Sequence, residues 1–147
     1  MNLKLRPCTN EDLESILFIE ESSFKDPWTK NAFYSELCDD SGCSRCLVVE
    51  DPSCSVIGYI VYQKILDEIY VKKVAVHSQM RKRGIGHFIF FNLFKEAKED
   101  GVFKIVLDCD VTNVEALRFY KDLGFQQVSE ANRDGSLRLE NKIGAAT

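Results

Sequence analysis

The chain has 147 residues, of which 45% are hydrophobic and 29% are charged, as expected for one globular domain and not for a disordered chain. The net charge of −4 disfavours non-specific binding of nucleic acid and mildly favours a cationic substrate. No apolar run reaches the roughly 18 residues of a membrane span, and the N-terminus lacks the apolar stretch of a secretory signal. We therefore expect a cytoplasmic protein with no membrane partner, folded as a single domain over residues 1–143 with a short flexible tail over 144–147.

The first half of the chain is predicted to contain more strand than helix. A short strand is expected over 3–6, and the capping sequence that begins at Thr9 predicts a helix after it. A second short helix is expected to begin at Thr29, with Trp28 and Phe33 packed together as a hydrophobic staple. Strands are predicted for three further runs, of which the first two form an antiparallel pair: 45–50, 55–63 and 68–77.

The second half is predicted to alternate helices with strands. Apolar residues at helical spacing mark a long amphipathic helix from Ile85, closed by Gly101, and a strand follows over 103–109. Thr112-x-x-Glu115 is expected to open another helix, and Asp134-Gly135 is the expected turn of a final hairpin. The order β-α-α-β-β-β-α-β-α-β-β contains one crossover, which should be right-handed and should join parallel strands.

The six cysteines need a separate interpretation. A chain of this size without a secretory signal is expected to keep them reduced. Cys38, Cys43 and Cys46 have the C-x4-C-x2-C spacing of a plant-type iron–sulfur loop, but the strand before Cys54 would carry this fourth ligand away. We therefore expect no metal, and a surface loop with one or two buried thiols, whose role stays open.

A basic, glycine-containing turn follows the apolar residues 74–76. Gly84 and Gly86 open the long helix, and glycines together with free helix N–H groups allow an anion to approach the backbone. Arg81, Lys82 and Arg83 add positive charge, so a phosphate or pyrophosphate ligand is expected, although such a turn can also be purely structural. A P-loop is excluded by its missing pattern, and a dinucleotide-binding G-x-G-x-x-G is excluded because its third glycine is absent.

Two stretches together resemble the GCN5-related N-acetyltransferase (GNAT) superfamily. Arg81-x-x-Gly84-x-Gly86 is similar to its acetyl-CoA pyrophosphate loop, and residues 113–125 are similar to its N…A…FY…LGF segment. The resemblance implies an α/β (α+β) fold with a mixed, mostly antiparallel central sheet and helices on both faces. In that fold the strands over 68–77 and 103–109 run parallel and splay around acetyl-CoA. Phe24, Pro27-Trp28-Thr29 and Leu66-Asp67-Glu68 look most like the bacterial ribosomal-protein-alanine N-acetyltransferases.

The same resemblance implies which residues bind acetyl-CoA, the cosubstrate. The backbone of 74–76 would pair with the pantetheine arm, and the amides of 82–87 would hold the pyrophosphate. Asn113 matches a residue that hydrogen-bonds the arm, although an asparagine there could simply begin a helix. The implied cofactor-binding residues are Val74, Ala75, Val76, Arg81, Lys82, Arg83, Gly84, Ile85, Gly86, His87 and Asn113.

Two catalytic residues are implied as well. Tyr120 matches the general acid that protonates the CoA thiolate; a tyrosine of pKa about 10 can donate to a thiol of pKa about 8.5, but it could also be a core aromatic. Asp108 stands where the ribosomal-protein enzymes carry a glutamate base, and its shorter side chain favours contact with the amine through water. Asp108 could instead be a structural charge at a strand end, with Glu68, Asp67 or Asp110 as the base.

The sequence thus predicts an acetyl-CoA-dependent N-acetyltransferase that acts by direct attack of a primary amine, most simply the N-terminal α-amine of a ribosomal protein. An α-amine has a pKa of about 7.7–8.0, against about 10.4 for lysine, so it needs little help from a base. Residues 131–135 form a short turn and lack the tyrosine-rich loop of the ribosomal-protein enzymes, which puts the protein substrate in doubt. The alternatives are a small-molecule amine (polyamine, amino acid or amino sugar) as acceptor, or a non-catalytic acetyl-CoA-binding module. The acceptor and the oligomeric state stay open.

Overall fold

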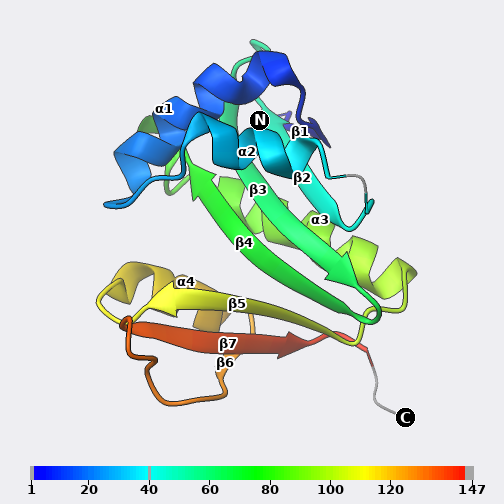
Figure 1. Ribbon diagram of the computed structural model, residues 1–147, viewed down its shortest axis with the longest axis vertical. Helices are drawn as coiled ribbons and strands as arrows, with labels where there is room; N and C mark the ends of the chain where they lie inside the picture. The colour runs from blue at the N-terminus through cyan, green and yellow to red at the C-terminus, as the bar shows by residue number, and fades with distance from the viewer. Residues whose placement is uncertain (1, 40, 145–147) are drawn as a thin grey trace.

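The computed structural model describes residues 2–39 and 41–144, and its seven strands form one sheet in the order β1-β2-β3-β4-β5-β7-β6 (Figure 1). The predicted order of helices and strands is confirmed. The strands are β1 (Lys4–Pro7), β2 (Ser44–Glu50), β3 (Val56–Ile65), β4 (Glu68–Val76), β5 (Lys104–Asp110), β6 (Gln126–Gln127) and β7 (Ser136–Lys142). The helices are α1 (Leu13–Ser23), α2 (Lys30–Leu37), α3 (Ile85–Glu99) and α4 (Val114–Asp122), with short 3-10 turns η1 (Asn10–Asp12) and η2 (Ser78–Met80).

The sheet is antiparallel throughout except between β4 and β5, which run parallel as predicted. Their pairing extends only from Glu68↔Lys104 to Val71↔Leu107, although both strands continue beyond it. Figure 1 shows the two strands diverging from that point. We call the space between residues 72–76 of β4 and 108–110 of β5 the fork.

A β-bulge stands at the start of the fork. In the β3–β4 register Val61 pairs with Lys73 but Tyr62 pairs with Val71, so Lys72 has no partner on β3. A bulge bends its strand and increases the local twist. It therefore turns β4 directly after Val71, its last residue paired with β5.

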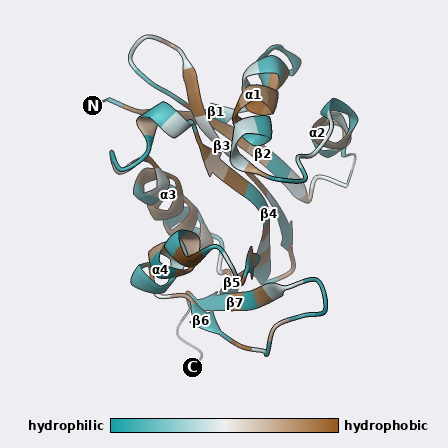
Figure 2. Cartoon of the chain, turned by 90° about the vertical axis from the view of Figure 1, so that its left-hand side faces the viewer, coloured by the Kyte–Doolittle hydropathy of each residue, from teal (hydrophilic) through white to brown (hydrophobic). Residues whose placement is uncertain are grey.

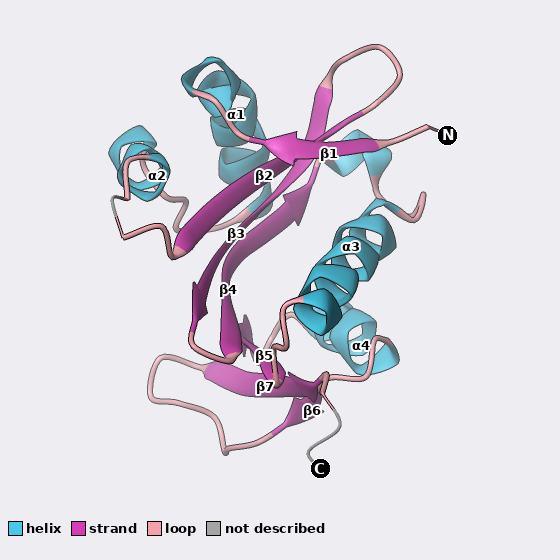
Figure 3. Cartoon of the chain, turned by 90° about the vertical axis from the view of Figure 1, so that its right-hand side faces the viewer, coloured by secondary structure: helices cyan, strands magenta, loops and turns pink. Residues whose placement is uncertain are grey.

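Helices cover the sheet on both faces, as expected: α1 and α2 lie on one face, and α3 and α4 lie on the other (Figure 3). Two clusters of buried side chains match these two layers, one around Ile89 and Phe90 of α3, the other around Ile16 of α1 and Phe33 of α2. In Figure 2 the hydrophobic colour is concentrated on the central strands and on α3. Strands β5, β7 and β6 are covered on the α3–α4 face, which leaves their other face open beside the fork (Figure 3).

The helix ends explain where the chain turns. Thr29 caps α2 by accepting a hydrogen bond from the Ala32 N–H at 3.2 Å, and the rings of Trp28 and Phe33 lie 5.1 Å apart, which confirms the predicted staple. For α4 the prediction was wrong by one residue. Asn113, not Thr112, is the cap, because its Oδ1 accepts from the Ala116 N–H at 3.2 Å.

The final hairpin is present, but its two strands differ in length. β6 has only two residues, and a long loop leads from it to β7. Gly135, with φ +84°, lies in the turn just before β7, where the Asn132 N–H donates to the Ser136 carbonyl at 2.7 Å. Of the predicted tail, only Gly144 is within the described residues; 145–147 lie outside them.

The described cysteines are all free thiols; Cys46 is buried in β2, whereas Cys38 and Cys54 are exposed. Among the described residues no three His, Cys, Asp or Glu side chains are grouped as a metal site. No helix in the same part of the chain is long and apolar enough to cross a membrane.

Candidate active site

The turn before α3 presents a row of free amides. Lys82 and Gly84 have positive φ angles of 62° and 81°, which is the left-handed conformation that turns successive N–H groups to one side. Phe88 is the first residue of α3 whose N–H finds an acceptor, the Gly84 carbonyl at 3.0 Å. The amides of 82–87 have no acceptor anywhere in residues 2–39 and 41–144. Such a row at a helix N-terminus fits an anionic phosphate group.

Arg81, although predicted to bind the cofactor, has its guanidinium engaged by the protein. Its Nε donates to the Val76 carbonyl at 3.1 Å and its Nη2 donates to Ser23 Oγ at 3.0 Å. These contacts tie the end of β4 to the end of α1. Lys82 and Arg83 are exposed and leave their charges beside the amides.

Gly86 has a packing role that the sequence did not reveal. A Cβ atom at this position would lie 3.0 Å from Cζ of Phe119 in α4. The glycine thus lets α3 approach α4 closely, and the neighbouring His87 ring also packs edge-on against Phe119 at 5.0 Å. The close approach of these two helices forms the protein surface beside the amide row.

The backbone of 74–76 lies on the free edge of β4 in the fork. On one side Val74, Ala75 and Val76 pair with Ile60, Tyr59 and Gly58 of β3. On the other side no strand of the described structure pairs with them, since the β5 register ends at Val71. This edge can therefore accept an extended chain such as a pantetheine arm, in the manner of an added strand.

A groove of about 600 Å³ lies beside the amide row and extends along α4. Its lining includes two cations, Lys82 and Arg118, two carboxylates, Glu115 and Asp122, and the ring of Phe119. A larger groove of about 720 Å³ lies between the start of α1 and the β2–β3 turn, and none of the predicted site residues lines it. The cofactor features therefore gather on the α3–α4 side.

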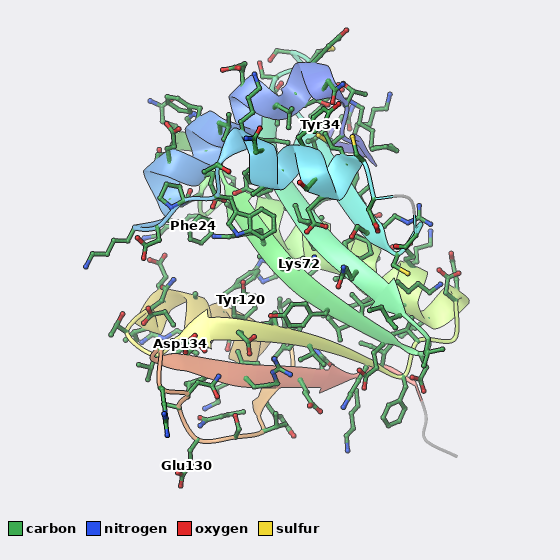
Figure 4. The ribbon with its side chains drawn as sticks, viewed as in Figure 1. Phe24, Tyr34, Lys72, Tyr120, Glu130 and Asp134 are labelled. Carbon is green, nitrogen blue, oxygen red and sulfur yellow. The ribbon has the colours of Figure 1, made fainter. Side chains whose placement is uncertain are left out.

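Tyr120 reaches the fork from α4. Its ring packs among Phe90, Phe119 and Phe125, with centroid distances of 5.5–5.7 Å. Burial raises the pKa of Tyr120 well above its ordinary value, so the hydroxyl keeps its proton at neutral pH. No hydrogen bond is formed by that hydroxyl within the described part of the chain, and Figure 4 shows Tyr120 in the gap between β4 and β5. The hydroxyl is therefore free to meet a ligand in the fork, although its raised pKa makes it a weaker acid than an ordinary tyrosine.

Asp108 is the first residue of β5 beyond its last pair with β4. Its carboxylate accepts hydrogen bonds from Arg138 Nε at 3.0 Å and Nη2 at 3.1 Å, and from the Tyr70 hydroxyl at 2.8 Å. Burial alone would raise the pKa of Asp108, but the hydrogen bonds from Arg138 and Tyr70 outweigh it and hold the pKa below the ordinary value. The carboxylate therefore lies at the start of the fork, and its hydrogen bonds make it a weak proton acceptor.

The other candidate bases lie elsewhere or are engaged. Glu68 pairs with Lys104 at 3.2 Å where β4 and β5 begin their pairing, at the closed end opposite the fork. Asp67 is in the turn before that strand. Asp110 accepts from the Thr112 N–H and hydroxyl at 2.8 and 2.7 Å and so fixes the loop before α4. Asp108 is thus the carboxylate best placed at the start of the fork.

The opposite wall of the fork is built on a buried ion pair. Glu20 of α1 is fully buried; it accepts from Lys73 Nζ at 3.0 Å, from the Trp28 N–H at 2.8 Å and from the Tyr59 hydroxyl. Lys73 Nζ also lies 3.8 Å from the centre of the Phe24 ring. This network holds the loop between α1 and α2 over β4. In Figure 4 Phe24 and Lys72 lie on this wall and Asp134 lies across the gap.

Comparison with known proteins places these features in a family. Residues 12–125 match the model of the acetyltransferase (GNAT) family. The chain is 28% identical over 116 residues to a Bacillus subtilis (strain 168) protein provisionally named as a ribosomal protein bS18-alanine N-acetyltransferase, which covers 79% of this chain and 76% of that protein. It is 25% identical over 118 residues to the ribosomal protein bS18-alanine N-acetyltransferase of Salmonella typhimurium, with 80% and 77% covered.

Solved structures share the fold. The ribosomal-protein-S18-alanine N-acetyltransferase from Escherichia coli matches with a TM-score of 0.85 at 20% identity, covering 99% of this chain and 97% of that one. Ard1 from Thermoplasma volcanium matches with 0.87 at 21% identity, covering 99% and 100%. A Thermoplasma acidophilum N-acetyltransferase in complex with coenzyme A matches with 0.82 at 17% identity, covering 97% and 99%.

The relatives confirm the resemblance predicted from the two motifs and from the Pro27-Trp28 segment. The family model spans most of the chain, including the amide row and α4. The chain therefore belongs to the acetyltransferase (GNAT) family, and it is an N-acetyltransferase whose cosubstrate is acetyl-CoA.

Proposed function

We propose that the protein acetylates the N-terminal α-amine of a protein, with a ribosomal protein as the first candidate. The observation that carries this proposal is the fork, where Tyr120 and Asp108 come from opposite faces of the sheet to the point at which β4 and β5 separate. The relatives named for acetylating ribosomal protein bS18 support the acceptor. We assign the reaction to the cytoplasm, where ribosomal proteins are made, and to one domain over residues 1–143.

Each part of the candidate site has a defined task in this reaction. The amides of 82–87 bind the pyrophosphate, the edge of β4 at 74–76 pairs with the pantetheine arm, and Lys82 and Arg83 add positive charge. Asn113 uses its Oδ1 to cap α4, which leaves its side-chain amide nitrogen for the arm. Acetyl-CoA supplies an activated thioester.

Tyr120 and the acceptor amine account for the protons that move in this reaction. The bond between the amine nitrogen and the acetyl carbon forms while the carbon–sulfur bond breaks, and the Tyr120 hydroxyl gives its proton to the departing sulfur. The nitrogen loses its extra proton as the amide forms, and Tyr120 takes up a proton again from solvent. Asp108 meets the amine directly or through one water. An α-amine of pKa about 7.7–8.0 is substantially neutral near pH 8, so it releases its proton to solvent without a strong base.

A turnover assay with matched acceptors tests the proposal. Acetyl-CoA is supplied with a peptide bearing a free N-terminal alanine and an internal lysine, with the same peptide blocked at its N-terminus, and with spermidine and free amino acids. We expect mass spectrometry to find the acetyl group on the α-amine of the free peptide and no product from the blocked one. Faster turnover of a small amine would overturn the protein substrate, and acetyl-CoA binding with no turnover of any amine would overturn catalysis.

A further inference from the structure

Arg138 of β7 and Asp108 of β5 face each other on neighbouring strands. They are direct partners in the antiparallel β5–β7 register, and both guanidinium contacts to the carboxylate are short, at 3.0 and 3.1 Å. A bidentate pair of this kind fixes orientation as well as distance. Arg138 therefore determines which way the Asp108 carboxylate points at the start of the fork.

Tyr70 completes the arrangement from the third strand. Its hydroxyl donates to Asp108 Oδ2 at 2.8 Å, and its ring lies 5.7 Å from the guanidinium carbon of Arg138. Strands β4, β5 and β7 thus each contribute one side chain to the start of the fork, on the face away from α3 and α4. Arg138 has 45% of its side chain exposed, so this face is open to an incoming acceptor.

The other charged groups nearby are already paired or repel Asp108. Lys72 and Lys73 of β4 turn to Glu36 at 2.6 Å and to Glu20 at 3.0 Å. Asp134, in the turn before β7, acts on Asp108 as a like charge, and Glu140 of β7 lies near Arg138. Arg138 is therefore the cation that Asp108 faces.

We propose that Arg138 is a positioning residue for the transfer reaction: it holds the Asp108 carboxylate in one orientation, so that Asp108 attracts and orients the acceptor amine instead of removing its proton. The inference rests on the proposed function, because it assigns Asp108 to the acceptor. A carboxyl whose pKa lies below about 3.9 takes a proton from an ammonium of pKa about 7.7–8.0 unfavourably, by about four orders of magnitude. It remains a strong hydrogen-bond acceptor, both for the ammonium as it arrives and for an N–H of the neutral amine that attacks.

A double-mutant cycle tests the assignment, with Arg138→Gln, Asp108→Asn, the double variant and the wild type assayed on the best acceptor. We expect Arg138→Gln to lower kcat/KM for the acceptor by about 10–100-fold, the scale of a misplaced group, and to leave KM for acetyl-CoA unchanged. In the Asp108→Asn background the same change should have little further effect. Arg138→Lys, which keeps the charge but loses the bidentate fit, should recover part of the activity.

Lys104→Gln is the matched control. Lys104 also bridges β5 and β7, through Glu140 at 3.4 Å, but it lies at the closed end of the β4–β5 pair, away from the fork. We expect its kcat/KM to stay close to that of the wild type. If Arg138→Gln behaves like Lys104→Gln, or if the Arg138 and Asp108 effects are fully additive, Arg138 has no positioning role.

A second measurement needs no acceptor, so it separates this inference from the proposed function. A carbon-13 NMR titration of the Asp108 carboxyl should give a lower pKa in the wild type than in Arg138→Gln, since burial then outweighs the one remaining hydrogen bond. Equal values in the two proteins would overturn the inference. Failure of every peptide acceptor, with the expected difference in titration, would overturn only the proposed substrate.

Discussion

Gly86 of α3 and Phe119 of α4 pack so closely that a methyl group on residue 86 would lie 3.0 Å from Cζ of the phenylalanine ring. The sequence motif explains this glycine by the approach of a pyrophosphate. The structure adds a second reason, which is the contact between the two helices that flank the cofactor side of the fork. The two glycines of the motif are therefore not equivalent, and they can be tested separately.

Replacement of Gly86 by alanine should destabilise the protein through this contact. Alanine ordinarily favours a helix over glycine by up to about 1 kcal/mol, but overpacking typically costs about 1–3 kcal/mol, so we expect a net loss. Urea denaturation measures it. In a Phe119→Leu background the same Gly86→Ala change should become neutral or stabilising, and an equal loss in both backgrounds would contradict the packing explanation.

Gly84 and Gly101 form a matched pair at the two ends of α3. Both have positive φ, 81° and 70°, and a Cβ atom on either would meet nothing within 4 Å. Gly84→Ala and Gly101→Ala should therefore lose similar stability, about 1–2 kcal/mol, from backbone strain. Calorimetry should show weaker binding of acetyl-CoA only for Gly84→Ala. Equal affinities in the two variants would remove the amide row from the cofactor site.

Tyr120→Phe removes the proposed proton donor and keeps the ring in its aromatic cluster. We expect kcat to fall by about 10²–10⁴-fold, the usual contribution of general acid catalysis, while acetyl-CoA affinity changes little. Tyr34→Phe, an exposed tyrosine of α2, is the control and should have wild-type kcat. Turnover of Tyr120→Phe within a few-fold of this control would make Tyr120 a core residue only.

Lys73→Met should be strongly destabilising because it leaves the buried Glu20 carboxylate without its cation. Breaking a buried pair by removing one partner costs about 3–5 kcal/mol. Lys30→Met, which loses only the exposed pair with Glu14, should cost less than about 1 kcal/mol. The free energy of unfolding from urea titration compares them. Adding Glu20→Gln to Lys73→Met should restore part of the loss, and no restoration would argue against the buried pair as the cause.

The pH dependence of stability follows from the lowered pKa of Asp108. A carboxyl with a lower pKa in the folded state stabilises the protein above its unfolded pKa of about 3.9, and this contribution disappears as the pH falls through the folded value. Asp108→Asn should therefore be less stable than the wild type at pH 7, and the difference should shrink by pH 3. Urea midpoints at the two pH values check this. If the stability difference between the variant and the wild type is the same at both pH values, it does not come from titration of the Asp108 carboxyl.

Local sequence patterns were sufficient for most of the fold. The staple between Trp28 and Phe33, the stop at Gly101 and the order of the elements all depend on residues close together in the chain, so spacing alone reveals them. The one-residue error at the start of α4 arose because Thr112 and Asn113 are both good caps. Thr112 is instead engaged by Asp110, a contact that the capping pattern does not encode.

The site was only partly predictable because several of its side chains meet across strands. Arg138 faces Asp108 from thirty residues away, and Lys73 reaches Glu20 from another layer of the molecule. Such partners depend on strand register and on the bulge at Lys72, which a single sequence does not specify. The motif located Asp108 and Tyr120, but the partner that makes Asp108 a weak base could be seen only in the sheet.

The two faces of the fork also determine from which side each substrate can reach it. Side chains alternate along β5, so Asp108 lies on one face of the sheet and its neighbour Cys109 lies on the face of Tyr120 and α3. An acceptor reaching Asp108 and a cofactor reaching the amide row would thus enter from different sides, and neither would block the other. Both substrates could then bind together in a ternary complex. The acetyl group could pass directly from one to the other, with no covalent acetyl-enzyme intermediate.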